Sequence, residues 1–182
     1  MIEIQQTDNL QPQQEARIRF LVESCADDFC PSLRCRTGSS QQNFSRGNGT
    51  DSVEEYLREM LGQKFLLAVE QGQILSFLTY KTGYSCPDLA GYAPCDYATT
   101  MITDPARRGE GIGALLYTAL ENRPDRSRFI GTRTWSTNAA QMHIFPKRGW
   151  KAVCVKENDR GEGIDTVYFV HEKEERPLPL QP

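Results

Sequence analysis

The 182-residue chain lacks the features that mark membrane proteins and most nucleic-acid-binding proteins. No stretch approaches the ~20 consecutive apolar residues that a membrane-spanning helix needs. Its 21 lysines and arginines are outnumbered by 24 aspartates and glutamates, whereas binding to phosphate backbones normally needs a basic excess. We therefore expect neither a membrane nor a nucleic acid as its partner.

Histidine is scarce, and the cysteines are not spaced as metal ligands. The histidines are His143 and His171, and none of the six cysteines belongs to a Cys-x-x-Cys pair, so we expect no metal site. Residues 1–20 contain Glu3 and Asp8 but no apolar run, and we expect no secretory signal there. The prediction is a cytoplasmic protein with free thiols.

The composition is that of an ordinary globular protein, with 38% apolar and 25% charged residues. The length predicts one domain, to which we assign residues 1–171. A charged, proline-rich tail, 172–182, follows it. Residues 29–50 and 83–96 are rich in turn-forming residues and are expected to be loops.

Apolar periodicity predicts four helices and six strands. The helices are expected over residues 12–28, 51 or 52 to about 60, 112–120 and 138–145. The strands are expected over residues 65–69, 74–80, 97–103, 129–135, 150–155 and 166–170. This order mixes hairpins with strand–helix–strand crossovers. It indicates an α/β fold, a single mixed, mostly antiparallel twisted sheet flanked by about four helices.

The segment 103–113 joins a predicted strand to a predicted helix and has the composition of a phosphate-binding turn. Helix starts expose unpaired N–H groups, and Gly109, Gly111 and Gly113 allow a phosphate to come close to the backbone. A P-loop is excluded, because Gly-Lys-Ser/Thr is missing. A dinucleotide site is disfavoured, because the next strand, which ends in the segment 134–138, carries no acid for a ribose.

Two motifs resemble the GNAT superfamily of N-acetyltransferases. Arg108-x-x-Gly111-x-Gly113 is similar to its Gln/Arg-x-x-Gly-x-Gly/Ala signature, and the preceding segment 101–105 resembles the strand that leads into it. The second match, to the family's Asn…Tyr-x-Lys-x-Gly-Phe stretch, consists of Asn138, Phe145, Lys147, Gly149 and Trp150. The two motifs cover about fifty residues, and the predicted element order agrees with the family.

The resemblance implies acetyl-coenzyme A as co-substrate. The pyrophosphate would be held by the N–H groups of Arg108, Gly109, Glu110, Gly111, Ile112 and Gly113. The pantetheine amides would pair with the strand edge formed by Met101, Ile102 and Thr103. Asn138 and Phe145 would flank the thioester. The implied reaction is direct transfer of acetyl, in a ternary complex, to a primary amine of a small molecule or peptide.

The chain departs from the family pattern at both positions that usually carry acid–base groups. Phe145 stands where many members have a proton-donating Tyr, and Tyr97 stands where some have a Glu base, with Asp96 beside it. Tyr97 is our candidate catalytic residue, as a proton relay. These departures also motivate an alternative, a non-catalytic acyl-coenzyme A binding or sensor module. His143 is expected to pack or to face solvent.

The resemblance implies that the loops 29–50 and 83–96 both lie on the acceptor side of the site, but they give opposite indications about the acceptor. The first contains Arg34, Arg36 and Arg46, which suit a carboxylate or phosphate, although the simpler interpretation is three solvated arginines. The second contains Asp88, Asp96, Tyr84 and Tyr92, which suit a cationic amine. The sequence does not choose between them. A homodimer is plausible by resemblance.

Overall fold

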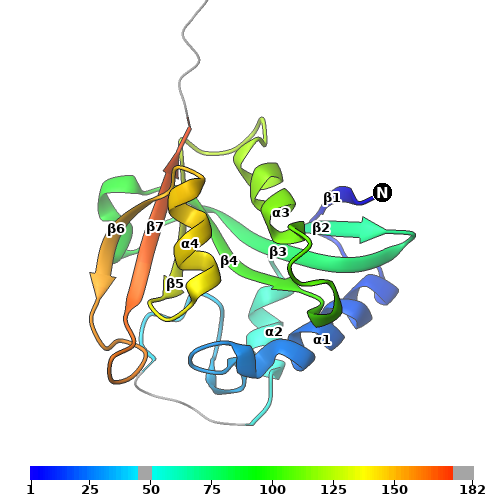
Figure 1. Ribbon diagram of the computed structural model, residues 1–182, viewed down its shortest axis with the longest axis horizontal. Coiled ribbons are helices and arrows are strands. Elements are labelled where there is room, and N and C mark those ends of the chain that lie inside the picture. The colour runs from blue at the N-terminus through cyan, green and yellow to red at the C-terminus, as the bar shows by residue number, and fades with distance from the viewer. Residues whose placement is uncertain (45–50, 174–182) are drawn as a thin grey trace, which may run out of the picture.

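One sheet with the strand order β1-β2-β3-β4-β5-β7-β6 forms the centre of the computed structural model, which describes residues 1–44 and 51–173 (Figure 1). The strands are β1 (Glu3–Thr7), β2 (Lys64–Glu70), β3 (Gln73–Tyr84), β4 (Cys95–Thr103), β5 (Phe129–Trp135), β6 (Lys151–Lys156) and β7 (Thr166–Glu172). The α-helices are α1 (Pro12–Cys25), α2 (Glu54–Met60), α3 (Ile112–Glu121) and α4 (Ala139–Lys147). Short 3₁₀ turns are η1 (Ala26–Asp28), η2 (Leu33–Cys35), η3 (Pro87–Tyr92) and η4 (Pro105–Arg107).

All neighbouring strands are antiparallel except β4 and β5, which are parallel and are joined through α3. The predicted fold class is thus confirmed. Helices α1 and α2 lie on one face of the sheet, and α3 and α4 lie on the other (Figure 1).

The sheet is buried on both faces because successive side chains of its central strands point to opposite sides. Leu67 packs with the α1 and α2 side chains, whereas its neighbour Leu66 packs with those of α3. A third cluster, which includes Leu89, Tyr97 and Tyr168, fills the space under η3. Strand β2 has an uninterrupted apolar run over residues 65–69, and most residues of β3 and β4 are buried, as expected for strands covered on both sides.

The structure corrects several element boundaries. Strand β1 was not predicted, because Gln5 and Gln6 break the apolar alternation of this edge strand. Helix α1 ends at Cys25 rather than at residue 28, since η1 takes over. Strand β3 continues to Tyr84 instead of ending at residue 80, and Gly83 lies inside it with a φ of +66°.

Other boundaries fall partly outside the described chain. Strand β7 runs through Glu172, one residue into the predicted tail, and residues 174–182 lie outside the described residues. So do residues 45–50 of the first predicted loop, including Arg46. Within the described ranges, no helix has both the length and the apolar character to cross a bilayer.

A buried ion pair fixes β4 to the segment that follows α3. The Asp96 carboxylate accepts hydrogen bonds from Arg123, from the Ser127 N–H (3.1 Å) and from the Ser127 hydroxyl (2.9 Å). The side chains of Asp96 and Arg123 are only 2% and 4% exposed. Removing one partner of such a pair leaves a buried charge without compensation. Asp96 therefore has a structural role on the α3 side of the sheet.

We predict that Asp96→Ala lowers the free energy of unfolding by about 3–5 kcal/mol, because Arg123 stays buried and unpaired. Urea denaturation at pH 7 measures the change. Asp125→Ala is the matched control, since Asp125 also contacts Arg123 but is 59% exposed, and its loss should cost less than about 1 kcal/mol. Equal effects of the two substitutions would contradict the assignment.

Candidate active site

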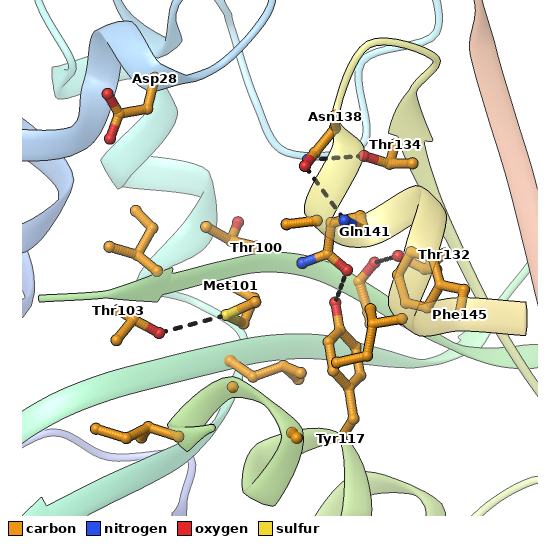
Figure 2. A pocket seen from close by; sticks show the side chains of 18 of the residues that line it. Asp28, Thr100, Met101, Thr103, Tyr117, Thr132, Thr134, Asn138, Gln141 and Phe145 are labelled. Atoms are coloured by element: carbon orange, nitrogen blue, oxygen red, sulfur yellow. Dashed lines mark hydrogen bonds between the residues drawn. The ribbon is translucent and has the colours of Figure 1, made fainter. Parts of the chain in front are cut away.

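The parallel strands β4 and β5 separate soon after they meet. They pair only at Asp96↔Ile130 and Tyr97↔Gly131, after which the Thr132 hydroxyl donates a hydrogen bond to the Ala98 carbonyl (3.0 Å). Beyond that point a cavity of about 750 Å³ opens between the strands. Its walls come from β4, β5, the turn before α3, and helices α3 and α4 (Figure 2).

A β-bulge in β4 lies where the cavity begins. Thr79 of β3 pairs with Thr100 and Tyr80 pairs with Ala98, so Thr99 is the extra residue. As a result Thr99 and Thr100 both contact residues in or just after α2: Thr99 donates to Gln63, and Thr100 shares a hydrogen bond with the Tyr56 hydroxyl (2.5 Å). Bulges re-aim the backbone of a strand and are common beside active sites.

The turn between β4 and α3 has the open backbone that was predicted from its glycines. Gly109 and Gly111 have φ values of +83° and +76°, which only glycine adopts without strain. Gly111 ends the turn, and its carbonyl accepts from the N–H of Ala114 (3.0 Å). The N–H groups from Arg108 to Gly113 donate to no acceptor within the described chain. Free amides at a helix start are an arrangement to which anions bind in proteins.

Gly113 has a different function from the other two glycines. A Cβ there would lie 3.2 Å from Cε and 3.3 Å from Sδ of Met101. Its absence lets the first turn of α3 pack closely against β4, which places the free amides next to the open strand edge. The helix start and the strand edge therefore belong to one continuous surface of the cavity.

The charged side chains of this turn are already paired. Arg108 lies 2.6 Å from Asp28, and this ion pair raises the pKa of Arg108; both residues line the cavity. Arg107 pairs with Glu70 (3.1 Å) and with Glu110 (2.8 Å). Glu110 points to Arg107 and is not among the cavity residues. Asp28 is the one carboxylate in the described cavity wall.

Helices α3 and α4 meet across the other end of the cavity. The Tyr117 hydroxyl donates to Oε1 of Gln141 (3.1 Å), as Figure 2 shows. Asn138 caps α4 by accepting from the Gln141 N–H (3.3 Å), and its Nδ2 donates to the Thr134 hydroxyl (3.0 Å). Phe145 is 1% exposed and packs with its ring edge-to-face on Tyr117, with centroids 5.3 Å apart.

Most of the residues predicted for the cofactor line this single cavity. They are Met101, Ile102, Thr103, Arg108, Gly109, Gly111, Ile112, Gly113, Asn138 and Phe145. Tyr97 does not line it: the side chain is fully buried under η3, and burial raises its pKa well above the usual range. His143 is exposed and lies at the cavity wall.

Sequence reasoning missed three features of the wall. Tyr117 was not predicted as a site residue because it belongs to the apolar pattern of α3, although its position one turn after Gly113 indicates that it lies near the cavity. The facing rings of Phe29 and Trp135 (5.7 Å between centroids) come from segments 106 residues apart and have no local signature. Arg133 was read only as part of a strand. Of the predicted loops, residues 29–50 contribute Phe29 to the wall, and residues 83–96 contribute none.

The first loop also carries a correction. Arg36, expected to be solvated, is 6% exposed and donates to the carbonyls of Pro31 (2.9 Å) and Cys30 (3.1 Å). Arg34 pairs with Glu23 (2.7 Å) outside the cavity. Asp96 was a candidate for binding a cationic acceptor. It instead forms a buried ion pair with Arg123 on the face of the sheet that α3 covers.

A comparison with family models matches residues 33–150 to the Acetyltransferase (GNAT) family. The chain belongs to the GNAT acetyltransferase family. It is thus an acetyltransferase that uses acetyl-coenzyme A, and the GNAT resemblance of its two motifs is confirmed. No curated protein matches the chain.

Solved structures share the GNAT fold over nearly the whole length. An N-acetyltransferase from Staphylococcus aureus has 13% identity and a TM-score of 0.67, with 96% of this chain and 99% of that chain covered. The yncA acetyltransferase from Salmonella typhimurium, solved with acetyl-CoA, has 15% identity and a TM-score of 0.64, with 98% of each chain covered. The aminoglycoside 6'-N-acetyltransferase from Enterococcus faecium has 18% identity and a TM-score of 0.65, with 97% and 99% covered.

The turn that carries the free amides is stabilised by Asp104, and this stabilisation depends on pH. Asp104 accepts from the Ala106 N–H (2.9 Å) and pairs with Arg17, and these bonds hold the pKa of Asp104 below its usual value. A depressed folded-state pKa contributes stability above the unfolded pKa of ~3.9, and that stability is lost as the pH falls through the folded value.

We predict that Asp104→Asn is about 1 kcal/mol less stable than the wild type at pH 7, and that the difference shrinks as the pH falls below ~4. Urea denaturation at a series of pH values measures it. Asp8→Asn, which changes an exposed aspartate, should show no such trend. A stability difference that grew as the pH fell would contradict the depressed pKa of Asp104.

Proposed function

We propose that this GNAT enzyme transfers acetyl from acetyl-coenzyme A to a primary amine of a small molecule or peptide, by direct attack within a ternary complex. The observation that carries the proposal is the continuity of three parts of one cavity: free helix-start amides, an open strand edge, and a closed end that contains the Tyr117 hydroxyl. Acetyl-coenzyme A supplies an activated acyl thioester.

The residues present fit this co-substrate. The N–H groups from Arg108 to Gly113 suit a diphosphate, because no acceptor in the described chain competes for them. The edge of β4 from Met101 to Thr103 lacks a strand partner on the β5 side and suits an added amide chain. The described wall is otherwise largely apolar, with Ile102, Ile112 and Phe145 among its members.

Direct attack is favoured over an acyl-cysteine route. Cys25 is the cysteine in the cavity wall, and burial raises its pKa, so that the sulfur stays a thiol at neutral pH. A cysteine nucleophile needs the thiolate and a neighbouring base. Its hydrogen-bonding partner is Arg108 (3.2 Å), which is a donor and cannot accept the proton.

The cavity contributes mainly by placing the amine. Orientation of two reactants can supply ~7–11 kcal/mol. A primary amine must also lose a proton, which for a pKa of ~10.4 costs roughly 4–5 kcal/mol at pH 7. Asp28 is held by Arg108 and is poorly suited as a base. We therefore place proton removal on solvent at the open side of the cavity.

Tyr117 is the proposed proton donor for the departing thiolate, in place of the Tyr that Phe145 replaces. Its hydroxyl reaches the same end of the cavity from α3, and its ring packs on Phe145. Burial raises the pKa of Tyr117, so the hydroxyl keeps its proton at neutral pH. Tyr97 remains a second candidate for the acid–base role, as a proton relay that does not itself line the cavity.

Binding of the co-substrate tests the first part of the proposal. We expect calorimetry to show acetyl-coenzyme A binding to the wild type and none to Gly111→Trp, because the indole fills the turn. Gly91→Trp is the control, since Gly91 is exposed and has nothing within 4 Å of an added Cβ. No binding to the wild type would end the proposal.

The rate at which the coenzyme A thiol is released distinguishes the two proposed proton donors, Tyr117 and Tyr97. We expect Tyr117→Phe to lower kcat by roughly 10–100-fold, with the affinity for acetyl-coenzyme A little changed, because a thiolate needs less protonation than most leaving groups. Tyr97→Phe is the matched comparison, as both substitutions remove one buried hydroxyl. A loss of kcat in Tyr97→Phe alone would move the role to Tyr97.

The sensor alternative makes a different prediction for the same assay. A binding module would bind acetyl-coenzyme A but release no coenzyme A with any primary amine beyond the rate of hydrolysis. The Tyr117 hydroxyl in the cavity favours the enzyme, since it restores a proton donor that Phe145 lacks.

A further inference from the structure

Three arginines surround a single phenylalanine beside β5. The guanidinium carbons of Arg36, Arg133 and Arg160 lie 5.2, 4.9 and 4.5 Å from the ring centroid of Phe44. They come from the loop after η2, from β5 and from the β6–β7 turn. The segment between η1 and η2 lies beside the β6–β7 turn, since Arg160 donates to the Cys30 carbonyl (2.6 Å).

These arginines are bonded to neutral acceptors. Arg133 donates to the Tyr168 hydroxyl (3.2 Å) and to backbone carbonyls of the first loop, and Arg160 donates to the Thr166 hydroxyl (2.9 Å). Among the residues that the structure describes, no carboxylate pairs with any of the three. Asp159, which interacts electrostatically with Arg160, accepts a hydrogen bond from the Thr166 hydroxyl (2.6 Å) and lies 3.7 Å from Nζ of Lys156.

Two members of the cluster, Arg36 and Arg160, are costly to keep charged without an anion. Arg36 and Arg160 are only 6% and 8% exposed, and like charges at short range repel in a medium of low dielectric constant. Burial, together with the neighbouring guanidinium groups, lowers the pKa of Arg160 to about 9, and burial lowers that of Arg36 to about 10. Carbonyl dipoles offset part of this cost, and a bound anion would offset far more.

The cluster adjoins the cavity. Arg133 is part of the cavity wall. Arg36 lies over the Phe29 ring (5.5 Å) and Arg160 lies over the Trp135 ring (5.6 Å), and both rings line the cavity. Arg133 therefore borders the cavity directly, whereas Arg36 and Arg160 lie against aromatic rings that line it.

We infer that Arg36, Arg133 and Arg160 select an acceptor amine that also carries a carboxylate or phosphate, with Arg133 as its contact and the other two strengthening the field. This rests on the proposed function, since it names the substrate class of that reaction. The same charge disfavours polycationic acceptors, in contrast to the aminoglycoside acetyltransferases among the structural neighbours.

Matched amine pairs test the inference. Each pair differs by one anionic group: tyrosine and tyramine, tryptophan and tryptamine, histidine and histamine, phosphoethanolamine and ethanolamine. Binding is measured by thermal shift with saturating coenzyme A, and turnover is measured by thiol release with acetyl-coenzyme A. We expect the anionic member of at least one pair to stabilise the complex and to have a kcat/KM at least tenfold above that of its partner.

Variants of Arg133 connect that preference to the cluster. Arg133→Gln should raise the KM of the preferred anionic amine at least tenfold with a smaller effect on kcat, and Arg133→Lys should restore part of the affinity, since it keeps the charge but loses the planar fork. Arg128→Gln, which changes an exposed arginine paired with Glu172, is the control. Unchanged affinity for acetyl-coenzyme A shows that the variants are folded.

The possible failures are distinct. If acetyl-coenzyme A binds but neutral or polycationic amines are preferred, or no anionic amine binds better than its partner, the inference is wrong and the cluster only fixes the first loop to the sheet. If Arg133→Gln lowers stability but leaves the anionic preference intact, the same conclusion follows. If acetyl-coenzyme A does not bind to the wild type, the proposed function itself fails.

Discussion

The early separation of β4 and β5 is the constraint on which the rest of the site depends. Two neighbouring parallel strands normally satisfy each other's N–H and C=O groups along their length. Here the pairing stops after Tyr97↔Gly131, and the bulge at Thr99 turns the edge of β4 just beyond that point. The open edge and the free amides of the α3 start are then adjacent. A continuous pairing would have closed the cavity and left the glycine turn without a ligand.

Local sequence predicted the parts of the site that local geometry determines. The turn from Arg108 to Gly113 was predictable because positive φ at Gly109 and Gly111, and close packing at Gly113, each demand glycine. Strand β2 was predictable because burial on both faces leaves an uninterrupted apolar run over residues 65–69. Strand β1 was not, since an edge strand tolerates Gln5 and Gln6 and is recognised only by its partner β2.

The features that sequence reasoning missed depend on contacts between distant segments. Tyr117 acquires its position from Gln141 of a different helix, and within α3 only its spacing from Gly113 separates it from a core residue. Arg36 is an exception: it looked like a solvated loop arginine, although the Pro31 carbonyl and the Phe44 ring that it contacts are only five and eight residues away, because the conformation of this loop has no local signature. A charge in a polar loop is expected to face water unless the fold supplies enough acceptors.

The arginines at one end of the cavity are neutralised by carboxylates, whereas Arg133 at the other end is bonded only to neutral acceptors among the described residues. At the turn before α3, Arg107 and Arg108 are neutralised by Glu70, Glu110 and Asp28, so recognition of an anion there depends on directed N–H groups. At the β5 end, Arg133 has only neutral acceptors among the described residues. The positive charge of Arg133 is therefore not neutralised by a neighbouring carboxylate. The surrounding rings and backbone have a low dielectric constant, so its electrostatic attraction for an anion is stronger than it would be in water. A ligand with a negative group is attracted to this end even though the chain as a whole carries a net charge of −3.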